Sequence, residues 1–259
     1  MNKVTTTETI DPAYKSLYKL GGAAAFLAAL LLLSEVIVFA LYPQPATVQD
    51  WFMLFQSNRI RGLLDFWALE APLYAMFTLV FLALYIALRK TNESLMAIAI
   101  TFALLGSAIF FATNNPLSML SLSDQFTAAT TDEQRTTLLA AGQALLTNTN
   151  QRAVGGFNMG LFLVSIAGLI ASGVMFQSNF FSRPTAYVGI LANGLSLADY
   201  LRQALTSSPF LALLVILPNA LFLVTWYVLA GRRLYQLVSF ERKTLFQQPR
   251  SKSFKPLSR

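Results

Sequence analysis

The residues best suited to chemistry in this sequence are charged and amide side chains that lie within, or at the ends of, long apolar stretches. A charge at the centre of a membrane helix costs about 2.5 to 3.5 kcal/mol on insertion scales, so such side chains are expected to face protein or water and to have partners. Carboxylates in this setting can contact a polar ligand, form ion pairs, or act as the acid and base of an enzyme. The candidates for a polar, ligand-binding pocket are Glu35, Arg59, Arg61, Asp65, Glu70, Asn158, Asp199 and Arg202.

Spacing along the chain predicts which of these charges pair locally. Arg61 and Asp65 are four residues apart, so in a helix their side chains share one face and can bond. Asp199 and Arg202, three apart, are expected to do the same. Glu35 and Glu70 have no basic residue three or four positions away, so we expect each to find a partner across the bundle or to be protonated.

Cysteine and histidine are both absent from the sequence. This removes thiolate nucleophiles, disulfides, Cys- or His-ligated zinc and haem sites, and the Ser-His-Asp triad. We therefore expect no metal and no cofactor, and we do not favour an enzyme. A carboxylate-based enzyme, with Glu35 or Glu70 as the acid and Asp199 as its partner, is the least favoured class of function.

Six apolar stretches are long enough to hold these residues in membrane-spanning helices. About 20 mostly apolar residues cross a hydrocarbon core of about 30 Å. Hydrophobic residues make up 55% of the chain and charged residues 12%, about half the charge of a soluble domain. The predicted fold is all-α, a polytopic membrane protein with six transmembrane helices over residues 20–41, 68–88, 94–112, 153–176, 185–205 and 209–231.

The net charge of +7 is distributed as expected for a membrane protein rather than for a nucleic-acid-binding one. If the first helix runs outward, most of the 19 basic residues fall on the inner side, and the positive-inside rule then puts both termini in the cytoplasm. The same topology brings Glu35, Glu70 and Asp199 to the outer leaflet. We expect a cytoplasmic tail at 1–17, a transmembrane domain over 18–238, and a basic cytoplasmic tail over 239–259 that contacts anionic lipid or docks a protein.

Two stretches between the predicted spans have helical patterns of their own. Residues 47–57 alternate polar and aromatic side chains, which predicts a short helix lying in the outer interface. Between the third and fourth spans, residues 131–134 read Thr-Asp-Glu-Gln, a capping box that predicts a helix start. The leucines that follow recur on one face of an amphipathic helix, which we expect to form a lid over the bundle or a surface for a partner or ligand. They are Leu138, Leu139, Leu145 and Leu146.

Small residues at spacings of four mark the fourth predicted span. Such a stripe lets the backbone of a neighbouring helix approach closely, more often within one bundle than between subunits. The residues expected to pack helices in this way are Gly156, Gly160, Gly168 and Ser172.

Five short blocks of the sequence are similar to a known bacterial family. The blocks are Ser123–Phe126, Ala128–Arg135, Leu138–Gly142, Ala144–Leu146 and Phe181–Leu191. The first four resemble the outer loop, and the fifth the start of the fifth helix, of domain-of-unknown-function family 4386. The resemblance covers about residues 15–240 and implies a six-helix, multi-pass protein of the bacterial cytoplasmic (inner) membrane. It implies no activity, because none is established for the family.

Three classes of function fit these observations. The prediction adopted is a membrane protein that binds or handles a small polar or amphipathic ligand in an outward-facing polar pocket. The alternative is a structural or regulatory membrane subunit whose charges are buried ion pairs. A carboxylate-based enzyme is the third. The sequence leaves the ligand, the partner and the oligomeric state open.

Overall fold

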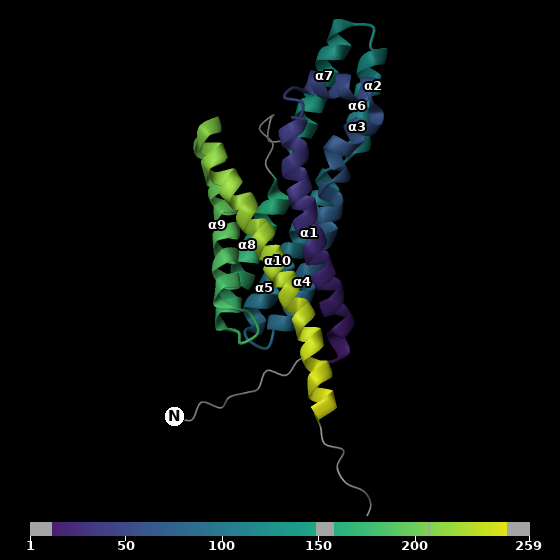
Figure 1. Cartoon of the computed structure of the whole chain (residues 1–259). Helices are drawn as coiled ribbons and strands as arrows, with labels where there is room; N and C mark the ends of the chain where they lie inside the picture. The colour runs from purple at the N-terminus through teal and green to yellow at the C-terminus, as the bar shows by residue number, and fades with distance from the viewer. Residues whose placement is uncertain (1–11, 149–157, 207, 248–259) are drawn as a thin grey trace, which may run out of the picture.

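A computed structural model describes residues 12–148, 158–206 and 208–247 of the chain, and every regular element among them is helical (Figure 1). Gly156, residues 1–11 and residues 248–259 lie outside these ranges, so the structure leaves the predictions for them open. The elements in chain order are η1 (Pro12–Tyr14), α1 (Lys15–Leu41), α2 (Val48–Ser57), α3 (Arg59–Leu63), η2 (Leu64–Ala68), α4 (Glu70–Leu88), α5 (Glu93–Thr113), α6 (Pro116–Ala128), α7 (Asp132–Asn148), α8 (Met159–Gln177), α9 (Arg183–Leu205) and α10 (Pro209–Gln247).

Five stretches of the described chain are long and apolar enough to cross a membrane. They are Lys15–Leu41, Arg59–Leu88, Glu93–Ala128, Met159–Gln177 and Phe210–Val238. Helix α9 is not among them, because it carries Arg183, Asn193, Asp199, Arg202 and Gln203 along its length. It nevertheless packs along both α8 and α10 (Figure 1). The described part of the chain is thus all-helical, as expected of a helical membrane protein, and five of its helical stretches have the length and composition of membrane spans.

The second span begins earlier than predicted, at Arg59 rather than Ala68. Asn58 starts this helix by accepting a hydrogen bond from the backbone N–H of Arg61 on its side chain (2.9 Å), as an N-cap does. The helix then passes through η2, a π-helical turn over Leu64–Ala68, before continuing as α4. The apolar pattern of the sequence does not extend over the turns before Ala68, because Arg59, Arg61 and Asp65 interrupt it, so the predicted span began too late.

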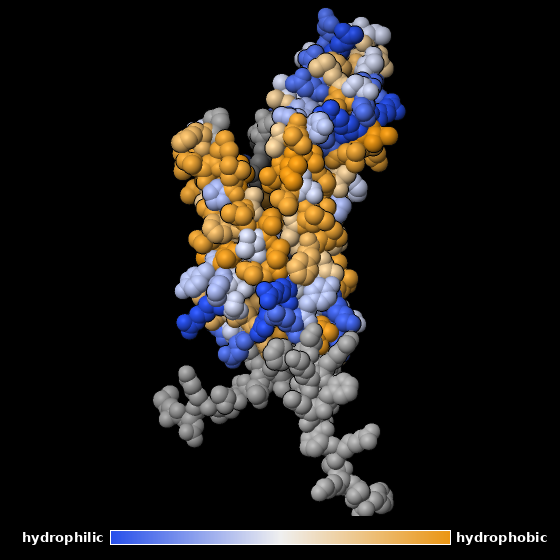
Figure 2. Space-filling view, viewed as in Figure 1, coloured by the Kyte–Doolittle hydropathy of each residue, from blue (hydrophilic) through white to orange (hydrophobic). Residues whose placement is uncertain are grey.

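The two opposite ends of the folded molecule differ in their helices and in their charged residues. We call the end with α2, α6 and α7 the cap end, and the opposite end, where α1 begins and α10 finishes, the tail end (Figure 1). An apolar band lies between two hydrophilic zones at these ends (Figure 2). At the tail end the hydrophilic zone includes basic residues of three helices (α1, α9 and α10) and of the α4–α5 turn. These are Lys15, Lys19, Arg89, Lys90, Arg183, Arg232 and Arg233.

In the half of the molecule nearer the tail end, α1 and α10 pack closely through small residues. A Cβ on Gly231 would lie 3.0 Å from the Ala25 Cβ and 3.0 Å from the Gly22 carbonyl oxygen. A Cβ on Gly21 would overlap Ala83 of α4 on the other side of α1. Backbones can approach this closely only where side chains are small. This contact region holds α1, α4 and α10 together in the main apolar core, which includes Tyr18, Phe81, Trp226 and Leu234.

The small stripe of α8 contacts two neighbours rather than one. A Cβ on Gly160 would lie 2.8 Å from the carbonyl oxygen of Gly106 in α5. Gly168 instead faces Asn193 of α9, and Ser172 faces Gly189 of α9. Four residues turn an α-helix by about 40° beyond a full turn, so a stripe at spacings of four winds round the helix from one neighbour to the next.

The cap end has a second, smaller apolar core. It contains Val48, Trp51, Phe52, Phe55, Phe66, Met119 and Leu146, from α2, η2, α6 and α7. A helix over residues 47–57 was expected and is present as α2, and its aromatic side chains are packed inside this core. Trp51 and Phe55 are fully buried, and Trp51 packs edge-on against Phe66 at 5.2 Å between ring centroids. This burial was not predicted, because the sequence does not show that α6 and α7 cover this face of α2.

Helix α7 begins and packs as its sequence predicts. Thr131 Oγ1 accepts a hydrogen bond from the Gln134 N–H (3.3 Å), and Gln134 Oε1 accepts one from the Thr131 N–H (3.4 Å), which completes the capping box. Leu146 and Gly142 are buried on one face, where a Cβ on Gly142 would lie 2.5 Å from Val48. The cap stands over the α1, α3 and α4 side of the bundle and does not extend over α9 and α10 (Figure 1).

Candidate functional site

The candidate site is a pocket formed where α1 and α10 diverge toward the cap end. No residue of α1 beyond Ala29 is buried, and none of residues 210–225 of α10 is buried, although both stretches are fully described. Pro218 interrupts the helical hydrogen bonds of α10 in this part of its length. The two helices separate as arms with apolar surfaces, and a notch lies between them (Figure 2).

The pocket has a volume of about 340 Å³ and walls from α1, α4, α8, α9 and α10. Three of the eight predicted site residues line it: Glu35, Glu70 and Asn158. Its other polar lining groups are Gln44, Tyr74, Ser165, Asn193 and Asn219. The remaining walls are apolar and include Val36, Phe39, Phe77, Ile216 and Leu223. This arrangement of a few polar groups in an apolar cavity can orient a molecule that has both kinds of surface.

Each helix contributes its lining residues at helical spacing. On α4 these are Glu70, Leu73, Tyr74 and Phe77, and on α1 they are Leu32, Glu35, Val36 and Phe39. Residues three, four and seven apart share one face of a helix. Tyr74 and Phe39 were not among the predicted site residues, but their four-residue distance from Glu70 and Glu35 is the signal that could have identified them.

Asn158 connects three helices at the pocket wall. Its side-chain oxygen caps α8 by accepting a hydrogen bond from the Leu161 N–H (2.8 Å), and it also accepts one from the Tyr74 hydroxyl (2.9 Å). Its backbone carbonyl accepts a third from the Tyr200 hydroxyl of α9 (2.9 Å). Both tyrosines and Asn158 are buried. Asn158 therefore fixes the position of α8 against α4 and α9 at the level of the two carboxylates.

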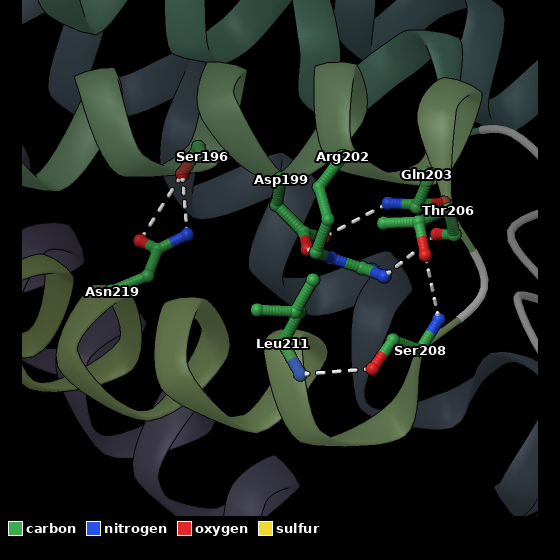
Figure 3. A network of polar contacts seen from close by, with 8 residues as sticks. All are labelled: Ser196, Asp199, Arg202, Gln203, Thr206, Ser208, Leu211 and Asn219. Carbon is green, nitrogen blue, oxygen red and sulfur yellow. Dashed lines mark hydrogen bonds and ion pairs between the residues drawn. The ribbon is translucent and has the colours of Figure 1, made fainter.

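The polar contacts of α9 in this region form two groups, one between α9 and α10 and one within α9 (Figure 3). Near the middle of the membrane-spanning part, the Asn219 amide and the Ser196 hydroxyl are hydrogen-bonded at 2.9 Å, which joins a pocket-lining residue of α10 to α9. Nearer the end of α9, Arg202 Nε donates to Asp199 Oδ1 (2.8 Å) and Gln203 Nε2 donates to Asp199 Oδ2 (2.9 Å).

Asp199 and Arg202 do not line the pocket, although both were candidates for it. The expected ion pair between them is present, with the Asp199 side chain 3% exposed and that of Arg202 14% exposed. Arg202 also donates to the carbonyl of Thr206 at the end of α9 (3.4 Å). The geometry of this pair is that of a structural contact that closes the last turn of α9.

Neither basic candidate of the second span lines the pocket: Arg59 contacts the cap, and Arg61 contacts a residue of its own span. Arg59 forms an ion pair with Asp124 of α6 (2.8 Å), which is also bonded by Gln56 of α2 (3.1 Å). Arg61 forms the expected pair with Asp65 at 3.5 Å. The backbone carbonyl of Asp65 accepts a hydrogen bond from Gln44 Nε2 (3.1 Å), and Gln44 lines the pocket. Depth along the membrane was expected to bring these residues to the same site as Glu70, but Arg59, Arg61 and Asp65 do not line the pocket.

Comparison with known proteins identifies the family of most of the chain. Residues 16–231 match the family described as Domain of unknown function (DUF4386). This confirms the resemblance seen in the outer-loop blocks. No curated protein and no solved structure matches the chain.

Proposed function

The chain belongs to the DUF4386 family, whose function is unknown, and we propose that it binds a small amphipathic ligand in the pocket between α1, α4, α8 and α10. The observation that carries the proposal is that Glu35, Glu70 and Asn158, which are remote in sequence, line one cavity with apolar walls. Its volume lies in the range of about 300 to 1,000 Å³ that is usual for small-molecule sites.

The shape of the pocket favours a ligand with an apolar chain. The parts of α1 and α10 that line the pocket are largely apolar and include Val36 and Phe39 on α1, and Ile216 and Leu223 on α10. The polar group of the ligand would contact the carboxylates and amides, and its apolar part would lie between the arms. A molecule of this kind can enter from the membrane as well as from water.

We propose the topology that the charges favour. The cap end would face outward and the tail end the cytoplasm of a bacterial cell, since the basic residues at the tail end satisfy the positive-inside rule. Helix α9 would be the sixth span, with its polar side chains turned toward α8 and α10. Both termini would then be cytoplasmic, and the basic residues beyond α10 would contact anionic lipid of the inner membrane.

A structural or regulatory subunit is the second candidate. It is favoured by the ion pairs Arg59–Asp124, Arg61–Asp65 and Asp199–Arg202, which bond within the protein and away from the pocket. These pairs account for five of the eight predicted site residues without a ligand. They do not account for the cavity around Glu35 and Glu70.

The proposed function is tested by filling the pocket. Ala220 lines it, and its neighbour Leu221 is 67% exposed on the outer surface of α10, so Ala220→Trp and Leu221→Trp are a matched pair. Small molecules and lipids that co-purify with the full chain are identified by mass spectrometry. We expect a molecule that is retained by the wild type and by Leu221→Trp and lost from Ala220→Trp. The same set of molecules from all three proteins would contradict the proposal.

A further inference from the structure

The pocket between the arms has a deep end, away from the cap. Helices α4, α8 and α10 all run from the cap end toward the tail end (Figure 1), so their last lining residues mark this deep end. These residues are Phe77, Ser165 and Tyr227, and we call them the floor of the pocket. The rings of Phe77 and Tyr227 stack, with 5.3 Å between their centroids. The floor is thus a packed aromatic surface with two hydroxyl groups.

The hydroxyl of Tyr227 is the group at the floor that the fold itself does not use. Ser165 Oγ, by contrast, donates to the carbonyl of Leu161 (2.8 Å). Tyr227 is 1% exposed, yet its hydroxyl forms no hydrogen bond with any described residue and retains some accessible surface. Because Tyr227 lines the pocket and is otherwise enclosed, this surface is on the cavity side.

Two other buried tyrosines near the pocket show what is usual for such a hydroxyl. Tyr74 donates to the side-chain oxygen of Asn158 and Tyr200 donates to its backbone carbonyl, both at 2.9 Å. The hydroxyl of a buried tyrosine generally finds a partner in this way. Tyr227 lies at the wall of a cavity and has no such partner among the described residues, which indicates that the occupant of the cavity supplies one.

The floor lies far from the polar groups at the cap end of the same pocket. On α4 the lining extends from Glu70 to Phe77, and on α8 from Asn158 to Ser165. Each pair is seven residues apart, which corresponds to about 10 Å along a helix. The walls between the two ends are largely apolar and include Leu73, Leu161 and Val164. An occupant that contacts both ends therefore needs an apolar middle and a polar group at each end.

The floor favours a neutral polar group over a charged one. None of its three residues is charged, and an ion placed there would lose its hydration without gaining a counter-charge. A hydroxyl can both donate to and accept from the hydroxyl of Tyr227. We propose that the ligand of the pocket is a chain with a polar group at each end, whose far end is a hydroxyl bonded to Tyr227. This inference rests on the proposed function and names the class of its ligand.

The assignment is tested with two probes of equal size, 1,8-octanediol and 1-nonanol, which have the same number of non-hydrogen atoms and differ in the second hydroxyl. Thermal unfolding of the full chain in detergent, over a range of probe concentrations, gives an apparent dissociation constant for each. The ratio of the two constants is compared between wild type and Tyr227→Phe, so that partition of the probes into detergent cancels. We expect the preference for the diol to fall about fivefold in Tyr227→Phe, which corresponds to one hydrogen bond.

Tyr187→Phe is the matched control, because Tyr187 is 60% exposed and does not line the pocket. It should keep the preference of the wild type. If Tyr227→Phe keeps that preference as well, the hydroxyl does not contact the ligand and the assignment is overturned. The proposed function then still holds, provided that Ala220→Trp abolishes stabilisation by both probes and Leu221→Trp does not. If neither probe stabilises the wild type, the assignment is overturned, and the molecules that co-purify with the protein decide the proposed function separately.

The protein without added probe tests the premise. Tyr227→Phe keeps the ring and its stacking on Phe77 and removes a hydroxyl that no described residue bonds, so it should melt at the temperature of the wild type. Tyr74→Phe, which loses a bond to Asn158, should melt lower. Equal lowering by both substitutions would show that the Tyr227 hydroxyl is bonded within the protein, and this would overturn the inference.

Discussion

The hydroxyl of Tyr74 in α4 donates a hydrogen bond to the side-chain oxygen of Asn158, 2.9 Å away, and so ties the pocket wall to the first turn of α8. Both side chains are buried, and Tyr74 stacks on Phe110 of α5 at 3.9 Å between ring centroids. A pocket formed between five helices needs such a contact, because helix ends otherwise move most freely. The pocket depends on this bond for its shape.

Replacing Tyr74 with phenylalanine should therefore destabilise the protein slightly and loosen the pocket. The ring and its stacking are kept, while one buried hydrogen bond is lost, so we expect a loss of about 0.5 to 1.5 kcal/mol of stability. Thermal unfolding in detergent measures this. Tyr187→Phe, at an exposed tyrosine, is the control and should leave the melting temperature unchanged. Identical melting of both variants would mean that the bond contributes nothing.

The close contact of α5 with α8 predicts opposite effects for two glycines on one helix. Gly160→Ala puts a methyl group 2.8 Å from the Gly106 carbonyl oxygen, so α8 has to move away and we expect a cost of about 1 to 3 kcal/mol. Gly173→Ala meets no atom within 4 Å and should stabilise α8 by up to about 1 kcal/mol through helix propensity. Melting temperatures of the two variants test this, and equal shifts would contradict it.

A substitution that forces α7 away from α2 should unfold the cap and leave the membrane-spanning helices folded. Gly142→Leu places a large side chain against Val48 and Phe52, where even a Cβ would lie 2.5 Å from Val48. Because the cap has its own apolar core, we expect faster cleavage of α7 by protease while the membrane spans stay protected. Ala140→Leu, on the exposed face of the same helix, should be cleaved at the wild-type rate. Cleavage of the spans in the Gly142 variant would show that cap and bundle unfold together.

The ion pair Asp199–Arg202 should matter for stability and not for the pocket. Removing one partner of a buried pair leaves a charge without compensation, so Asp199→Leu should cost about 3 to 5 kcal/mol. Replacing both, with Asp199→Leu and Arg202→Met, should recover much of this loss. A double-mutant cycle of unfolding measurements gives the coupling. If the double variant is as unstable as the single one, the pair does not act as a unit.

Much of this fold follows from the sequence alone, because apolar length and capping signals act locally. The α7 capping box and the pairs Arg61–Asp65 and Asp199–Arg202 depend only on residues three or four apart, and all three are present. The burial of Trp51 and the separation of Asp199 from the pocket could not be predicted. They depend on which helices become neighbours, and apolar helices of similar length carry little information about their order of packing.

The meeting of Glu35 and Glu70 in one pocket predicts how a cysteine there will react. The chain has no cysteine, so a membrane-impermeant thiol reagent on intact cells reports only on the residue introduced. Glu35→Cys lines the cavity and should label from outside, whereas Leu33→Cys faces away and is exposed in the apolar band, where thiolates do not form. Ala220→Trp should block labelling of the Glu35 position by filling the same cavity, and Leu221→Trp should not. If Glu35→Cys reacts no faster than Leu33→Cys, water does not reach the pocket from outside, and entry from the membrane between α1 and α10 becomes the route to test.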